Sequence, residues 1–132
     1  MNWKLIIQLS LFGLAMAVGT VFWIPGNIES FFWLPIFLIC AYLIVKNTTG
    51  KYFMHGFYLG LANCVWVTSA HIIFYETYIG NHPDEAAMTA KMPEFLATHP
   101  QVAMAVMGPI IGIISGLVLG LFAFIAGKLM KK

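Results

Sequence analysis

Charged side chains are scarce in this chain, and arginine is missing from it altogether. Only 9% of the 132 residues are charged and 61% are apolar, whereas soluble domains carry about 25% charged residues. A soluble domain of this length leaves much of its surface in water, so it could not hide so many apolar side chains. The composition therefore argues against a soluble domain and indicates a protein that folds in a lipid bilayer.

The absence of arginine bears on the partners of the protein, and the positions of its two cysteines bear on whether they form a disulfide. Arginine supplies the planar fork that grips phosphate with two hydrogen bonds, so we expect no nucleic acid partner. The two cysteines, Cys40 and Cys64, lie inside apolar runs at depths that differ by about 9 Å along the helix axis. A disulfide tolerates about 7 Å between Cα atoms, so we expect two free thiols.

Four uncharged or nearly uncharged runs are long enough to cross a membrane, since about 20 apolar residues in a helix span its hydrocarbon core. They must be helices, because every backbone hydrogen bond has to be satisfied within the lipid. The segment Ala15-Met16-Ala17 mimics a signal-peptide cleavage site. The apolar run continues past it to Ile24, so we expect a retained first span. The sequence predicts an all-α, integral membrane four-helix bundle, one domain over 1–132, with spans at about 5–24, 28–45, 52–79 and 102–126.

The lysines decide how these spans are oriented. Three regions that share one side of a four-span chain hold six of the seven lysines, namely Lys4, Lys46, Lys51, Lys128, Lys131 and Lys132. All five acidic residues fall on the other side, namely Glu29, Glu76, Asp84, Glu85 and Glu94. Positive charge marks the cytoplasmic face. We therefore expect a multi-pass protein of the bacterial inner membrane with both termini in the cytoplasm and lipids as its first partners.

Glycines repeat at helical spacing in the last span. Residues spaced by four share one face of a helix, and glycine on that face lets another helix come close. The glycines expected to pack the third span against the fourth are Gly56, Gly60, Gly108, Gly112, Gly116 and Gly120. The same stripe is compatible with self-association into a homo-oligomer, or with a substrate path along the glycines.

Polar residues inside the membrane gather on the third and fourth spans. We expect a polar cavity at Asn63, Thr68, Ser69 and Ser115. An unpaired amide near the bilayer centre is costly, so Asn63 should bond to Ser115 or to a backbone carbonyl.

Histidines and carboxylates follow the third span in "HIIFYETYIGNHPDE". The candidate residues for an outer metal or acid–base site are His71, Glu76, His82, Asp84, Glu85 and His99. Their spacing matches no zinc pattern such as HExxH, and His71 and Glu76 point about 140° apart on one helix. We interpret the segment as a helix arriving at water, followed from Pro83 by a short helix on the outer surface. We expect no catalytic residue, no metal and no cofactor.

Two features of the sequence occur in a characteristic order along the chain. Four predicted spans cover nearly the whole chain, and the third leaves the membrane through aromatic residues into "YIGNHPDE", Tyr78 to Glu85. In this order the chain resembles a family of small four-span bacterial inner-membrane proteins defined by a domain of unknown function. The resemblance implies the fold and no activity. Small multidrug exporters differ because they carry a glutamate in the first span, and fluoride channels and membrane glutathione-conjugating enzymes differ because they depend on arginine.

Two classes of function fit these features better than an enzyme does. The first is a non-enzymatic membrane protein that acts through helix association, as a homo-oligomer or as an accessory subunit of a larger membrane complex. The alternative is a small transporter or lipid-binding protein that uses the polar cavity near Asn63, Thr68 and Ser115. An enzyme built on the outer histidines and carboxylates comes third.

Overall fold

The computed structural model describes residues 1–24 and 26–130, and the side chains of residues 26, 27, 84–86 and 89 lie outside that description. Within these ranges the regular structure is helical and no strand is present, which confirms the all-α prediction. The helices are α1 (Trp3–Leu9), α2 (Leu11–Phe22), α3 (Gly26–Asn47), α4 (Tyr52–Ile73), α5 (Tyr75–Asn81), α6 (Pro83–Ala90), α7 (Glu94–Thr98) and α8 (Pro100–Met130).

Four helical stretches of the described chain are long and apolar enough to cross a membrane. They are Trp3–Phe22, which joins α1 and α2, then Ile28–Asn47, Tyr52–Ile73 and Pro100–Met130. At about 1.5 Å per residue, the helix α4 is about 33 Å long, close to the thickness of a hydrocarbon core of about 30 Å. The predicted four apolar helices are therefore present.

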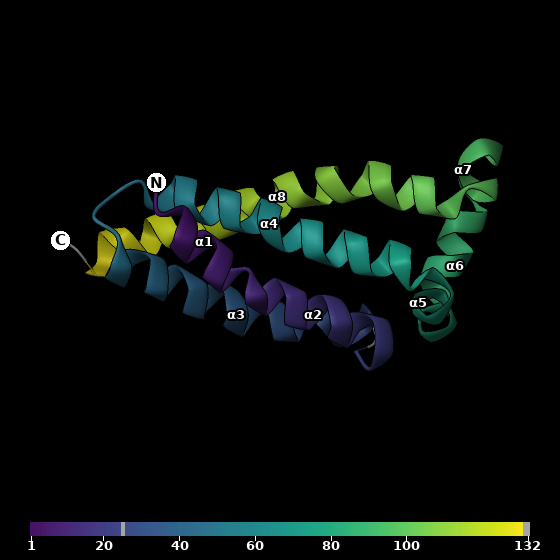
Figure 1. The fold of residues 1–132 in the computed structure, drawn as a ribbon, viewed down its shortest axis with the longest axis horizontal. Helices are drawn as coiled ribbons and strands as arrows, with labels where there is room; N and C mark the ends of the chain where they lie inside the picture. The colour runs from purple at the N-terminus through teal and green to yellow at the C-terminus, as the bar shows by residue number, and fades with distance from the viewer. Residues whose placement is uncertain (25, 131–132) are drawn as a thin grey trace.

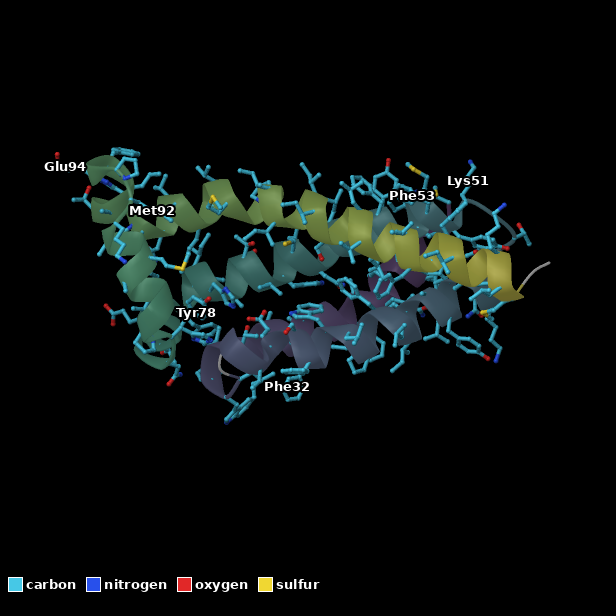
Figure 2. All side chains as sticks on the ribbon, turned by 180° about the vertical axis from the view of Figure 1, so that it is seen from behind. Phe32, Lys51, Phe53, Tyr78, Met92 and Glu94 are labelled. Carbon is cyan, nitrogen blue, oxygen red and sulfur yellow. The ribbon has the colours of Figure 1, made fainter. Side chains whose placement is uncertain are left out.

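Both ends of the chain lie at the same end of the bundle, as Figure 1 shows. Lys51 and Phe53 lie at this end too, whereas Tyr78, Met92 and Glu94 lie at the other (Figure 2). We call the first the lysine end and the second, which carries α5, α6 and α7, the acidic end. The termini and the 47–51 loop lie at the same end because the described chain has an even number of long helical stretches.

Helices α4 and α8 form the central pair and run side by side over most of their length (Figure 1). Helix α2 packs on α4, and the approach is close because Gly13 faces Asn63: a Cβ atom at Gly13 would lie 2.8 Å from the Asn63 Cα. Helix α3 packs mainly on α8. Helices α2 and α3, although consecutive, touch only lightly.

Two clusters of buried apolar side chains hold the bundle together, and α3 takes part in only one. The cluster at the lysine end draws on all four long stretches and consists of Ile6, Leu9, Cys40, Ala41, Ile44, Leu59, Leu119 and Ala123. The second cluster lies toward the acidic end and consists of Ala17, Val21, Ala70 and Tyr78. Helix α3 is thus fixed mainly at the lysine end, which leaves space beside α4 and α8 farther along.

The stretch predicted as the third span, 52–79, is helical on both sides of a break at Phe74. Helix α4 ends at Ile73, Phe74 has non-helical backbone angles (φ −105°, ψ 37°), and α5 begins at Tyr75. The first span is likewise divided, at Ser10. The Ser10 hydroxyl donates to the Ile7 carbonyl at 2.6 Å and accepts from the Trp66 indole at 3.1 Å, so the junction of α1 and α2 is tied to α4.

Candidate functional site

The six glycines of the predicted packing face lie between α4 and α8. A Cβ atom at Gly56 would lie 2.7 Å from the Gly120 Cα, and one at Gly116 would lie 2.7 Å from the Phe57 carbonyl oxygen. At Gly112 the nearest atom is the Cβ of Cys64, at 3.0 Å. Gly60 faces Gly116 and Gly108 faces Thr68 in the same way. The glycine face is therefore occupied by a helix of the same chain.

Where α3 leaves the bundle, two adjoining hollows open between α3, α4 and α8. The first, which we call the Asn63 hollow, has a volume of about 410 Å³. The second, the His71 hollow, has a volume of about 380 Å³ and reaches toward the acidic end. The two share the lining residues Glu29, Cys64, Val67 and Ile111, so they form one lateral cavity along the bundle.

The predicted polar cavity corresponds in part to these hollows. Asn63 and Ser115 line the Asn63 hollow, and Thr68 lines the His71 hollow. Ser69 is exposed on the surface of α4 and lines neither. Val67 and Thr68 both face the cavity. Ser69 lies about 100° farther around the helix than Thr68 and faces outward.

Asn63 lacks the hydrogen-bond partner that we expected. Its side chain is only 2% exposed, and neither the amide nitrogen nor the amide oxygen has a partner among the described residues. Ser115 lines the same hollow without bonding to it. A buried polar group without a partner costs about 1–3 kcal/mol, and such groups call for a specific explanation.

Glu29 and Trp33 also line the cavity, although neither was among the site residues expected from the sequence. Both line the Asn63 hollow, and the Trp33 indole nitrogen donates to the Glu29 carboxylate at 3.0 Å. The two residues are four apart, which places them on one face of α3. The sequence signal was present in this spacing, but only the divergence of α3 shows that the face borders a cavity.

Rings from α4, α5 and the α5–α6 junction form a stack at the acidic end. The ring centroids of His71 and Tyr78 are 3.8 Å apart, and those of Tyr78 and His82 are 4.2 Å apart. On an unbroken helix, residues seven apart would be displaced by about 10.5 Å. The break at Phe74 is therefore what allows His71 and Tyr78 to stack.

This stack is anchored to the carboxyl end of α2. The Asn81 amide donates to the Val21 carbonyl at 2.8 Å, and the His82 Nε2 lies 3.1 Å from the Ile24 carbonyl oxygen. The last carbonyls of a helix lack partners within it. Asn81 therefore caps α2 from a distant part of the chain, and His82 contacts the backbone just beyond the end of this helix, so both have a structural role.

Of the candidate residues for an outer site, the structure describes the side chains of His71, Glu76, His82 and His99. Glu76 is exposed on α5, and His99 is exposed, 2.9 Å from the Phe95 carbonyl oxygen. The side chains of Asp84 and Glu85 lie outside the described residues. Over the part of the chain that is described, no group of three or more His, Cys, Asp or Glu side chains is placed to hold a metal. Among the described candidates, His71 and His82 are brought together, on either side of Tyr78.

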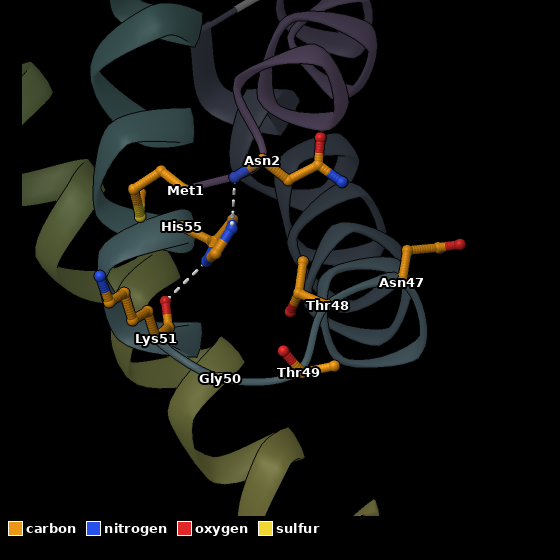
Figure 3. Close-up of a pocket in the computed structure, with 8 residues that line it drawn as sticks. All are labelled: Met1, Asn2, Asn47, Thr48, Thr49, Gly50, Lys51 and His55. Atoms are coloured by element: carbon orange, nitrogen blue, oxygen red, sulfur yellow. Dashed lines mark hydrogen bonds between the residues drawn. The ribbon is translucent and has the colours of Figure 1, made fainter.

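A larger hollow of about 590 Å³ lies at the lysine end, between the chain start and the 47–51 loop. Figure 3 shows His55 at its centre, with its Nδ1 2.7 Å from the Lys51 carbonyl oxygen and its Nε2 3.1 Å from the Asn2 backbone nitrogen. Nδ1 donates and Nε2 accepts, so both ring nitrogens are used. His55 thus holds the amino terminus against α4. Neither of its ring nitrogens is available to a ligand in the hollow.

No protein family model, no curated protein and no solved structure matches this chain. The resemblance drawn from the sequence therefore gains no support from these comparisons. Functional inference rests on the lateral cavity and its lining residues.

Proposed function

We propose that this protein is a multi-pass membrane protein that binds a lipid or a similar amphiphile in the lateral cavity between α3, α4 and α8. Four long apolar helices support a membrane location, and the lysines at one end favour the orientation in which that end faces the cytoplasm of a bacterial cell. An amphiphile is the natural ligand because the cavity is open to the side, where lipid surrounds the bundle.

The observation that carries this proposal is the unpartnered amide of Asn63. A ligand headgroup with a hydroxyl or an ester carbonyl would supply the hydrogen bonds that the described chain does not. Ser115 lines the same hollow and offers a further donor and acceptor. The remaining walls include Trp33, Phe37 and Ile111, which suit an acyl chain.

The test is mass spectrometry of lipid bound to the protein after purification in mild detergent. We expect the wild type to retain a defined lipid and Asn63→Leu, which keeps the volume and removes the amide, to lose most of it. Ser69→Leu is the matched control because Ser69 lies on the same helix outside the cavity. The proposal fails if the wild type carries no defined lipid, or if Asn63→Leu retains as much as the control.

A second candidate is association, as a homo-oligomer or as an accessory subunit. With the glycine face occupied by α4, it would use the outer side of α3, where an apolar groove of about 310 Å³ runs beside α8. Leu38 and Tyr42 of α3 line this groove and are exposed. Light scattering in detergent tests it: an assembly that Leu38→Lys dissociates supports association, and a monomeric wild type excludes the homo-oligomer.

A further inference from the structure

Sulfur atoms are concentrated around the His71 hollow. Four of the eight methionines of the chain line it. Met88 comes from α6 and Met92 from the link that follows this helix, while Met104 and Met107 come from the first two turns of α8. Methionines from two distant parts of the chain thus line one space of about 380 Å³. Methionine has three rotatable bonds, so these side chains can converge on a small ion.

His71 adds a ring nitrogen that is positioned by a neighbour. Its Nε2 lies 2.8 Å from the Thr20 hydroxyl oxygen, and this hydroxyl also lies 3.1 Å from the Ala17 carbonyl oxygen. In the tautomer in which Nε2 donates to Thr20 while Thr20 donates to Ala17, the lone pair of the neutral ring is on Nδ1.

We propose that the His71 hollow binds a soft monovalent metal ion, Cu(I), through His71 Nδ1 and two or more of the four thioethers. Thioethers select Cu(I) among the biological metals, and imidazole also suits copper. A histidine ligand characteristically donates its other ring N–H to a fixed partner, which is the role that Thr20 fills. Glu29 lines the same hollow and offers one negative charge against the single positive charge of the ion.

Cys64 is not part of the proposed ligand set, although it lines the hollow. It precedes His71 by seven residues on α4, which is a rise of about 10.5 Å, too far for both side chains to reach one ion. The set also differs from the hard carboxylate donors considered from the sequence. The proposal does not rest on the binding of a lipid in the adjoining Asn63 hollow.

The test is an anaerobic competition titration of the full chain in detergent against a coloured Cu(I) chelator. We expect one Cu(I) per chain, and at least a tenfold loss of affinity in the double variant Met104→Leu/Met107→Leu. Leucine keeps the apolar volume and removes sulfur, so folding should be preserved. Met54→Leu is the matched control, because Met54 is exposed at the lysine end, and it should bind as the wild type does.

Thr20→Val provides a second variant that leaves every proposed ligand in place. Loss of a partner of this kind lowers metal affinity about 10–100-fold, and X-ray absorption of the wild-type complex should show both sulfur and nitrogen neighbours. Absence of stoichiometric binding in the wild type, unchanged affinity in the double methionine variant, or loss of binding in Cys64→Ala would each overturn the proposal. The lipid test is separable, since the methionine variants should keep their lipid and Asn63→Leu should keep its Cu(I).

Discussion

A single amide gives the sharpest prediction at the scale of the residue. Asn63 has no partner among the described residues, so Asn63→Leu should raise the stability of the ligand-free protein by about 1–3 kcal/mol, the cost of leaving such a group buried. Thermal unfolding of delipidated protein in detergent, followed by tryptophan fluorescence, measures this. A lower midpoint than that of the wild type would mean that Asn63 is paired in the folded protein.

Glycine substitutions test the packing of α4 on α8. A Cβ atom at Gly56 would lie 2.7 Å from the Gly120 Cα and from the Leu119 carbonyl oxygen. Both are backbone atoms that cannot turn aside, so we expect Gly56→Ala to destabilise by about 1–3 kcal/mol. Gly80→Ala is the control, because no atom lies within 4 Å of its Cβ position, and it should stabilise α5 by about 0.5–1 kcal/mol.

The outcome to look for is opposite shifts of the unfolding midpoint in the two variants. Equal shifts would show that the close approach of α4 and α8 is absent in solution.

The glycine positions were accessible from the sequence because spacing by four residues fixes a helix face whatever the rest of the chain does. The choice between packing within the chain and packing between chains was not accessible, since both need the same bare face. The surroundings of the Asn63 side chain could not be predicted either. That side chain faces Gly13 on α2, a neighbour that no local pattern in α4 identifies.

At the scale of the element, the ties between the α5–α6 junction and α2 lead to a prediction about proteolysis. Asn81 donates to the Val21 carbonyl in the last turn of α2, and His82 Nε2 lies 3.1 Å from the Ile24 carbonyl oxygen just beyond that helix, so the variant Asn81→Ala/His82→Ala should loosen α5 and α6. Lys91 follows α6 and is exposed, which makes trypsin cleavage after it a local reporter. We expect cleavage several times faster in the double variant.

Glu76→Ala serves as the control in that experiment, because Glu76 is exposed on the same helix and bears none of these bonds. Cleavage that is equally fast in the wild type and in the double variant would contradict a structural role for the pair.

Long elements could be predicted from the sequence, whereas breaks in them could not. Four runs of apolar residues sufficed for the long helices, since lipid leaves an apolar segment no other regular choice. The break at Phe74 accompanies the stacking of Tyr78 between His71 and His82 and the contacts of Asn81 and His82 with the distant Val21 and Ile24 carbonyls. The spacing of residues within the third apolar stretch cannot predict contacts with residues so distant in the sequence.

At the scale of the whole molecule, the lateral cavity follows from unequal packing along α3. All four long stretches meet in the cluster at the lysine end, but α3 is missing from the cluster at the other. An antiparallel bundle with equal contact along every helix would have closed over Asn63. The cavity is therefore a property of the assembled helices. This explains why its polar residues could be predicted from the sequence, whereas its shape and the presence of Glu29 in its lining could not.

The central claim is that the bundle crosses the membrane with the lysine end in the cytoplasm. Thr49 and Thr77 are both exposed, one in the loop before α4 and one on α5, so each can be replaced by cysteine after Cys40 and Cys64 are changed to alanine. In intact cells, a maleimide that cannot cross the inner membrane should label Thr77→Cys, and should label Thr49→Cys only after permeabilisation. Labelling of Thr49→Cys in intact cells, or protection of Thr77→Cys, would contradict the account.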